Sequence, residues 1–165
     1  MPGIEQSKPL RKMGLQSSPT GMLFLDDVRV GRDRLLGESE EAFKGSAGRE
    51  ASKATFVIER SGVAAMALGI IERCLEKCID YSKERQTWGK PIAEYQLIQD
   101  KLARMFMHLQ HSQNLMFKQL TLTMEGSSMT AADASASKLY SALYATDTHI
   151  DAVHTPHATA YLPDY

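Results

Sequence analysis

Two short stretches of the sequence carry residues suited to chemistry, one at Glu59-Arg60 and the other at Arg85 and Thr87. Glu59 lies in the segment TFVIERSGV, among apolar neighbours. Apolar surroundings make a carboxylate more basic, which suits it to take a proton as a general base. The alternative is a glutamate on a helix surface, paired with a nearby arginine or lysine.

The second stretch, RQTWGKP, closes a helical pattern with the turn-forming residues Gly89 and Pro91. A pyrophosphate group is bound by a cation and hydrogen-bond donors near a chain turn, and Arg85 and Thr87 provide both. The alternative is that Arg85 is a cation at a helix C-terminus, where the helix dipole favours positive charge.

The histidines form a third group of candidate residues. His108 and His111 are three positions apart on one expected helix. A second group gathers near the C-terminus and consists of His149, Asp151, His154 and His157. Histidine and aspartate together are able to bind a metal ion. Solvated or capping histidines explain the same residues, and we expect no metal site.

The spacing of apolar residues predicts three long helices, over about residues 51–85, 93–124 and 130–153. Intervals of three and four place the apolar residues on one face of each helix. The expected faces are Val63, Ala67, Ile70, Ile71, Cys74, Leu75 and Cys78; Tyr95, Ile98, Leu102, Met105, Leu109, Met116 and Leu120; and Ala132, Ala136, Leu139, Tyr140, Leu143 and Ile150. Long helices joined by short loops pack antiparallel. The predicted fold is mainly α: an antiparallel bundle of three long helices, an incomplete four-helix bundle, with a short N-terminal β segment.

The N-terminal part of the chain has strand character. Residues 21–30, GMLFLDDVRV, predict two short strands around the turn-forming pair Asp26-Asp27. The side chains expected to point inward are Met22, Phe24, Val28 and Val30. We expect residues 1–48 to be the end of a β-domain with a linker, and residues 49–165 to be a helical bundle domain.

The composition is that of an ordinary globular protein, with 165 residues, 43% hydrophobic and 24% charged. A net charge of −1 gives no electrostatic case for binding nucleic acid or an anionic membrane. No apolar run approaches the roughly 20 residues of a membrane span, and no apolar leader segment opens the chain. Cys74 and Cys78 are expected to be small core hydrophobes. Together these features predict a cytoplasmic, reducing environment.

The sequence resembles the acyl-CoA dehydrogenase family from the end of its β-domain through its C-terminal bundle. GMLFLDDVRVGRDRLLGESEEAF is similar to the family stretch F-x-D-V-x-V-P…LLGE…GF, with Gly31 at the usual proline. The segment from Glu59 onward resembles the pattern R-x-x-x-A…ALG…R-x-x-F-G-x-P-[IL]…QxxLADM. Its matching residues are Arg85, Gly89, Lys90, Gln96, Gln99, Leu102 and Met105.

The resemblance implies a chemistry for the first stretch. Family members are usually homotetramers with FAD, and they remove two hydrogens across the α,β-bond of an acyl-CoA thioester. In some branches the base lies immediately before the arginine of this helix, a position that Glu59 matches. Arg60 then orients the base and the thioester, and Phe56 lines the substrate site. Val57 departs from the family, because many relatives have an aspartate there that meets the pantetheine arm.

The resemblance also implies a role for the second stretch. In relatives this turn reaches the FAD of a neighbouring subunit. Arg85 and Thr87 match contacts to the pyrophosphate, and Trp88 replaces a phenylalanine that shields the flavin. Residues that match positions near the FAD ribose and adenine are Ile92, Tyr95 and Gln96. Segment 154–160 departs from the family, where a glutamine and paired glycines hold FAD.

Two functions of different classes follow. The first is an acyl-CoA dehydrogenase-like flavoprotein fragment, which dehydrogenates an acyl-CoA thioester with FAD and works as a dimer or tetramer. The second is a non-catalytic helical module, truncated or degenerate, which acts in oligomerisation or as a partner subunit. The missing domains and the altered segment 154–160 favour the second function, and Glu59 favours the first.

Overall fold

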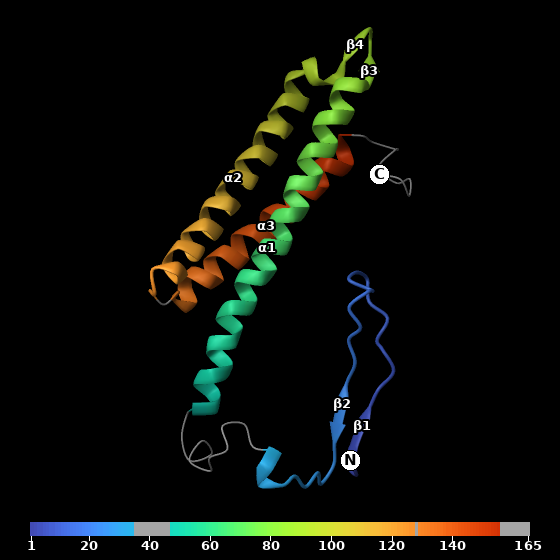
Figure 1. Cartoon of the computed structure of the whole chain (residues 1–165). Coiled ribbons are helices and arrows are strands. Elements are labelled where there is room, and N and C mark those ends of the chain that lie inside the picture. Colours follow the sequence, from blue (N-terminus) through green and yellow to red (C-terminus); the bar gives the residue numbers. More distant parts are fainter. Residues whose placement is uncertain (35–46, 128, 156–165) are drawn as a thin grey trace. The chain divides into compact units, whose positions relative to one another are not determined.

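The computed structural model describes residues 1–34, 47–127 and 129–155 of the chain. It divides into two units, Met1–Gly48 and Arg49–Tyr165. Three long helices build the second unit, and Figure 1 shows them side by side: α1 (Ala47–Glu84), α2 (Gln96–Met124) and α3 (Ala131–His154). Between α1 and α2 lie the short strands β3 (Gln86–Thr87) and β4 (Lys90–Pro91) and a 3-10 turn, η3 (Ile92–Glu94). The predicted mainly helical class and three-helix bundle are confirmed.

The first unit contains a strand pair whose partners the sequence pattern did not predict. Strand β2 (Leu23–Leu25) pairs antiparallel with β1 (Ile4–Gln6), near the N-terminus. The expectation of a second strand after Asp27 is wrong. Asp27 has φ of 42°, a left-handed conformation that interrupts an extended strand. The backbone N–H of Asp26 instead donates to the carbonyl of Gly3 at 2.8 Å, which closes the pair at that end.

The side chains expected to point inward in this unit are largely exposed. Met22, Phe24 and Val30 have exposed fractions of 49%, 50% and 59%. A two-stranded ladder is too small to bury both of its faces. A short 3-10 turn, η1 (Arg32–Arg34), follows β2. The strand pair therefore has little apolar core of its own.

The core of the second unit lies where the three helices meet. Its buried residues are Ala67, Ile71, Leu75 and Cys78 from α1, Met105 and Leu109 from α2, and Ala145 from α3. The α1 residues recur at intervals of three and four and belong to the predicted face. Val63 and Ile70, also predicted on that face, are exposed. The buried stripe of α1 is thus narrower than the apolar stripe in its sequence.

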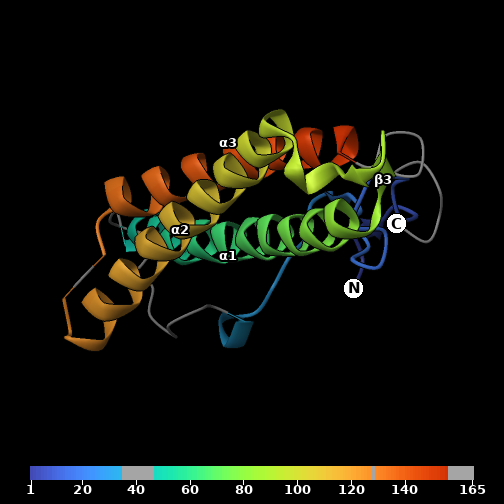
Figure 2. The same cartoon turned by 90° about the horizontal axis from the view of Figure 1, so that it is seen from above.

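The predicted inner face of α3 is wrong. Leu139, Leu143 and Ile150 have exposed fractions of 67%, 52% and 49%. The buried residues of α3 are small and occupy another face: Ala134, Ser137, Ser141, Ala145 and Thr148. Small side chains let α3 pack closely against its neighbours, and Figure 2 shows α2 running obliquely across α3. The larger apolar residues then remain on the outer surface.

Thr130 caps the N-terminus of α3, as is usual for a threonine at the start of a helix. The hydroxyl oxygen of Thr130 accepts a hydrogen bond from the backbone N–H of Asp133 at 3.1 Å. This contact satisfies one of the free N–H groups at the helix start. Hydrogen bonds from Thr130 and from Lys118 of α2 hold the pKa of the Asp133 carboxyl below its usual value.

His108 of α2 packs into the contact with α3. Its Nδ1 atom lies 3.2 Å from the hydroxyl oxygen of Thr148, and its ring lies against Tyr144 with centroids 4.3 Å apart. Burial lowers the pKa of His108 below its usual value. The nearby carboxylates Asp147 and Asp151 oppose this shift, whereas Arg104 and His111 add to it.

The free energy of unfolding is expected to fall as pH is lowered through the region near and below about pH 6.5, the ordinary histidine value. Because the pKa of His108 is lowered in the folded state, the unfolded chain binds its proton more readily. His108→Gln should flatten this decline in urea unfolding measured from about pH 7 to about pH 5. His149→Gln, at an exposed position of α3, is the control. If the free energy of unfolding declined equally with pH in both variants, His108 would not be the cause of the decline.

One described helix, α1, is long and apolar enough to cross a membrane by length and composition alone, because one 18-residue window within Arg49–Glu84 has a mean hydropathy of 1.5. The sequence analysis did not predict a helix of this apolar character, because Glu59 and Arg60 interrupt the apolar run. A core helix of a folded domain passes the same test. The inner residues of α1 form the bundle core, which explains part of its apolar content.

Candidate functional site

Glu59 and Arg60 lie in the N-terminal part of α1, before its first buried residue. No residue of α1 from 49 to 63 is buried, and the buried positions begin at Ala64. Glu59 is exposed and Arg60 is half-buried. Among the described residues, no ion pair or side-chain hydrogen bond involves Glu59. Glu59 therefore lies on an exposed helix surface, as the alternative predicted, and within the described part of the chain it has no paired cation.

Glu59 shares its side of α1 with a row of exposed apolar residues. This exposed stripe consists of Phe56, Val63, Met66 and Ile70, with exposed fractions of 53%, 38%, 53% and 50%. Positions 56, 59, 63, 66 and 70 are separated by three and four residues, which places them on one face of a helix. A molecule or domain that covers this stripe removes water from the Glu59 carboxylate. Desolvation makes a carboxylate a stronger base.

The second predicted site is a small hairpin beyond the end of α1. Strands β3 and β4 pair antiparallel, with Thr87 opposite Lys90. The two residues of the turn, Trp88 and Gly89, have φ of 51° and 80°. Two-residue hairpin turns of this kind require positive φ at both positions. Trp88 stands at the tip with an exposed fraction of 91%. A strained, nearly fully exposed tryptophan marks this turn as a place of functional interest.

Tyr95 anchors the hairpin to the start of α2. Its hydroxyl donates to the backbone carbonyl of Thr87 at 2.8 Å. Its ring meets the Trp88 ring edge-on at 6.4 Å and lies 4.3 Å from the Lys90 ammonium. The backbone N–H of Ile92 donates to the carbonyl of Arg85 at 2.8 Å. One ordered segment thus carries every predicted cofactor residue: Arg85, Thr87, Trp88, Ile92, Tyr95 and Gln96.

Alanine at Gly89 is expected to lower the free energy of unfolding by about 1–2 kcal/mol, the cost of a left-handed L-residue. Gly69→Ala is the matched control, because Gly69 lies inside α1 and an added Cβ meets no atom within 4 Å. That change should raise the free energy of unfolding by about 1 kcal/mol. Urea unfolding of both variants measures the difference, and equal effects would argue against the turn geometry.

The structure does not bring the two predicted sites together within one chain. Glu59 lies in the N-terminal half of α1 and Arg85 directly follows its last residue, so the two are about 39 Å apart at the helical rise of 1.5 Å per residue. One ligand group cannot contact both. A single site built from Glu59 and the hairpin therefore needs a second copy of the chain or other protein segments.

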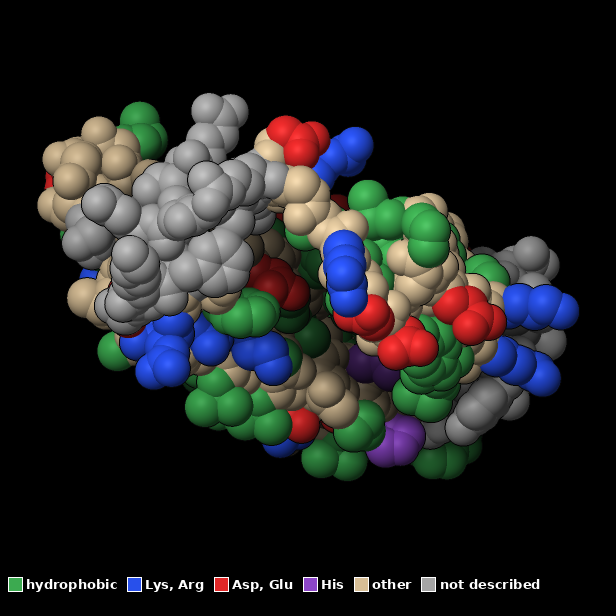
Figure 3. All heavy atoms as spheres, turned by 90° about the horizontal axis from the view of Figure 1, so that it is seen from below, with side chains coloured by type: hydrophobic (Ala, Val, Ile, Leu, Met, Phe, Trp, Pro, Cys, Tyr) green, Lys and Arg blue, Asp and Glu red, His purple; other side chains and the backbone are tan. Residues whose placement is uncertain are grey.

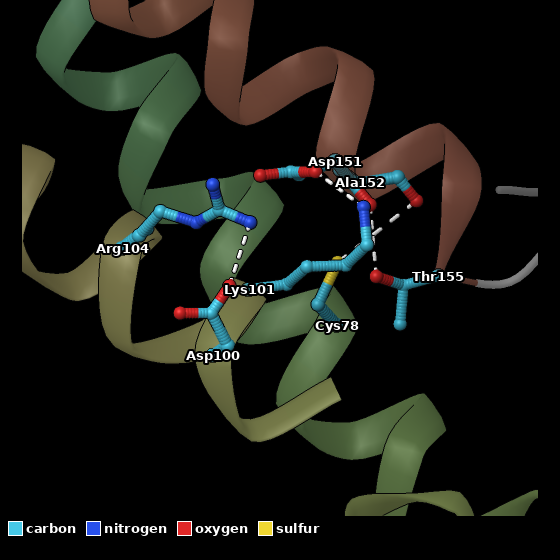
Figure 4. Close-up of polar contacts among 7 residues, drawn as sticks. All are labelled: Cys78, Asp100, Lys101, Arg104, Asp151, Ala152 and Thr155. Carbon is cyan, nitrogen blue, oxygen red and sulfur yellow. Dashed lines mark hydrogen bonds and ion pairs between the residues drawn. The ribbon is translucent and has the colours of Figure 1, made fainter. Parts of the chain in front are cut away.

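A polar cluster that the sequence pattern missed closes the last turn of α3. Figure 4 shows the Lys101 ammonium of α2 paired with the Asp151 carboxylate of α3, and both side chains are largely buried. The Thr155 hydroxyl donates to the Asp151 carbonyl at 2.8 Å. The Cys78 thiol of α1 points to the carbonyl of Ala152 at 4.0 Å. Lys101 and Asp151 are far apart in sequence, so no local pattern predicted the pair.

The prediction of two core cysteines is confirmed for Cys78, whereas Cys74 is half-buried and outside the core cluster. Both are free thiols, and Cys78 belongs to the core. Burial raises the pKa of Cys78 to about 11 and raises that of Cys74 as well. A thiol that holds its proton is a poor nucleophile and metal ligand. Within residues 1–34, 47–127 and 129–155, no group of three or more His, Cys, Asp or Glu side chains is placed to hold a metal ion.

Comparison with known proteins agrees with this fold. Residues 46–165 match the family model described as "Acyl-CoA dehydrogenase, C-terminal domain". The short-chain specific acyl-CoA dehydrogenase of Megasphaera elsdenii is 37% identical over 140 residues, covering 85% of this chain and 35% of the relative. Cyclohexane-1-carbonyl-CoA dehydrogenase of Geobacter metallireducens is 30% identical over 164 residues, which cover 99% of this chain and 41% of the relative.

The solved structure of butyryl-CoA dehydrogenase from Megasphaera elsdenii matches with a TM-score of 0.86 at 35% identity, covering 99% of this chain and 41% of that one. The helical unit is thus the C-terminal domain of a dehydrogenase fold. The chain belongs to the acyl-CoA dehydrogenase family, which confirms the resemblance found in the sequence. It spans 35% to 41% of the length of the relatives named here.

The part of the chain that departs most from the family pattern lies largely outside the described residues. The expectation that segment 154–160 lacks the glutamine and paired glycines concerns mainly residues 156–160, which are among those not described. His154, the last residue of α3, is exposed. The described part of the candidate site is therefore the exposed stripe with Glu59, together with the hairpin.

Proposed function

We propose that this chain is the C-terminal part of an acyl-CoA dehydrogenase-like flavoprotein, which forms an α,β-double bond in an acyl-CoA thioester. The observation that carries the proposal is Glu59 in the middle of an exposed apolar stripe on α1. The names of the relatives support the substrate class, since they act on acyl-CoA and on cyclohexane-1-carbonyl-CoA. The other domains of such an enzyme come from outside these 165 residues.

In this proposal Glu59 takes the α-proton of the thioester. The stripe residues Phe56 and Val63 contact the acyl chain and exclude water, which strengthens Glu59 as a base. Arg60 is adjacent and half-buried, and in this proposal it orients the carboxylate and the thioester end of the substrate. FAD, when bound, would accept the second hydrogen, from the β-carbon, together with its electron pair as hydride.

The hairpin has the chemistry for one end of FAD. Arg85 and Thr87 offer a guanidinium and a hydroxyl to a pyrophosphate. Trp88, held out from the fold at 91% exposure, is available to cover a flavin ring. Because Glu59 and the hairpin that follows α1 are about 39 Å apart, the hairpin serves the cofactor of a neighbouring subunit. The working protein is therefore a homo-oligomer in this proposal.

Residues 1–48 complete the proposal as the end of a β-domain, with residues 49–165 as the bundle domain. The exposed apolar residues of the strand pair support this, because a larger sheet buries them. We place the protein in the cytoplasm, a proposal supported by its two free thiols.

A second function rests on a different observation, the apolar outer faces of α2 and α3. Their exposed apolar residues are Phe106, Phe117, Leu120 and Met124 on α2, and Leu139, Leu143 and Ile150 on α3. Figure 3 shows hydrophobic side chains at the surface among charged ones. Apolar patches of this kind are typical of protein–protein contacts. They support a non-catalytic module that acts by oligomerising or as a partner subunit.

FAD titration combined with analytical ultracentrifugation separates the two functions. The flavoprotein is expected to bind FAD in proportion to protein, and its flavin fluorescence should change on binding. The non-catalytic module is expected to form oligomers that remain colourless at saturating FAD. Oligomers without FAD would overturn the first proposal and support the second.

A further inference from the structure

The position of Glu59 depends on how the first part of α1 is attached to the bundle. This part, residues 49–63, has no buried residue. At its end, the Ser61 hydroxyl donates to the side-chain oxygen Oε1 of Gln119 on α2 at 2.9 Å. Ser61 lies just before Ala64, the first buried residue of α1. The Ser61–Gln119 bond is therefore a polar attachment at the edge of the packed core.

Gln119 connects three helices through one side chain. Its exposed fraction is 5%, which is unusual for a glutamine. Its Oε1 atom accepts from Ser61 of α1, and its Nε2 atom donates to the backbone carbonyl of Asp133 in α3 at 2.9 Å. Both ends of the amide are thus satisfied in the interior. A buried amide with both partners fixed has one orientation, and so it determines where Ser61 lies.

Ser61 and Glu59 point to opposite sides of α1. Two residues along a helix correspond to a rotation of about 200°, at 3.6 residues per turn. When Ser61 faces α2, Glu59 therefore faces away from the bundle, toward the exposed stripe. Loss of the Ser61 attachment frees α1 to bend or rotate at this turn. Displacement by about 1 Å is enough to reduce the rate of a positioned reaction.

We propose that Gln119, acting through Ser61, is a positioning residue that fixes the turn of α1 carrying Glu59. The effect on catalysis rests on the proposed function of Glu59. The claim that Gln119 holds the helix turn through Ser61 does not depend on that function. Gln119 contacts neither substrate nor cofactor. It acts by holding the helix turn and, through Asp133, by connecting that turn to the beginning of α3.

Amide hydrogen exchange of the chain tests the structural content. Gln119→Leu and Ser61→Ala are expected to speed exchange about 3- to 10-fold over residues 55–63, as the loss of one hydrogen bond implies. Exchange over residues 67–82 should change less than about 2-fold. Ser61→Thr keeps the hydroxyl and should restore protection. Thr146→Ala is the control, because it removes a hydroxyl contact within α3 alone. Unchanged exchange at 55–63, or equal acceleration along all of α1, would overturn the inference.

Kinetics of the flavin-loaded protein test the positioning role. Gln119→Leu is expected to lower kcat about 10-fold and to leave KM within about 2-fold, with Ser61→Thr close to wild type. An unchanged kcat despite faster exchange would overturn the positioning role. Wild-type protein that is not reduced by any acyl-CoA would contradict the proposed function, and the exchange pattern would still decide whether Gln119 holds the turn.

Discussion

Glu59→Gln is expected to slow flavin reduction by an acyl-CoA about 10²- to 10⁴-fold, the usual contribution of a general base. Glutamine has nearly the same shape and hydrogen-bonding reach, but it cannot accept the α-proton. Glu59 is exposed on α1, so the change should leave the fold intact. FAD binding should also be unaffected, because Glu59 is not among the residues predicted to contact the cofactor.

Stopped-flow measurement of anaerobic flavin reduction checks this result. Glu72→Gln is the matched control, since Glu72 is another exposed glutamate of α1. Its rate should match the wild type. If Glu59→Gln protein is reduced as fast as the Glu72→Gln protein, Glu59 is not the base, and the apolar stripe around it needs another explanation.

Arg85→Met is expected to weaken FAD binding about 10- to 100-fold, because a hydrogen bond to a charged group contributes about 1.5–3 kcal/mol. Methionine keeps much of the side-chain length and loses the guanidinium. Lys83→Met removes the same charge two residues away on the exposed end of α1 and should change FAD affinity little. Fluorescence titration of flavin at low and at high salt measures both variants.

The salt dependence distinguishes a specific contact from general attraction. A surface cation attracts an anionic ligand less at high ionic strength. Arg85→Met should therefore remain weaker than Lys83→Met at high salt if the guanidinium contacts the pyrophosphate. Equal affinities for both variants would remove Arg85 from the cofactor site.

The sequence predicted the helices well because their signal is repeated over many residues. The first helix begins at Ala47 rather than near residue 51, and the third begins at Ala131, next to the predicted start at residue 130. The inner face of α3 was not predictable from hydrophobicity. Its buried positions are alanines and hydroxyl residues such as Ser137 and Ser141. A search for periodic hydrophobic residues does not count these residues as core positions. Where two helices pack closely, the side chains between them must be small, whether or not they are apolar.

Contacts between distant segments were also beyond the sequence pattern. Strand β1 pairs with β2 across a long polar segment, and nothing in Ile4–Gln6 alone marks it as a strand. The Ser61–Gln119 bond and the Lys101–Asp151 pair join positions far apart in the chain. Local patterns give the residues of a candidate site, and the fold decides which of them meet.

The predicted site residues divide into two groups in the structure. The cofactor residues from Arg85 to Gln96 gather in one ordered segment, held by Tyr95. Glu59, Arg60 and Phe56 lie far from them, in the N-terminal half of α1. The sequence alone did not indicate how far Glu59 lies from the cofactor residues. The two groups are close in sequence, but the long helix between them places them far apart in space. The separation is the physical reason for proposing an assembly of several chains.

The most direct measurement for the proposed function is anaerobic mixing of the flavin-loaded protein with a short series of saturated acyl-CoA thioesters. The oxidised-flavin absorbance is expected to disappear, and one equivalent of the α,β-unsaturated thioester is expected to form per flavin. A protein that binds FAD but is reduced by no member of the series, or that forms oligomers and binds no FAD, would contradict the proposed function.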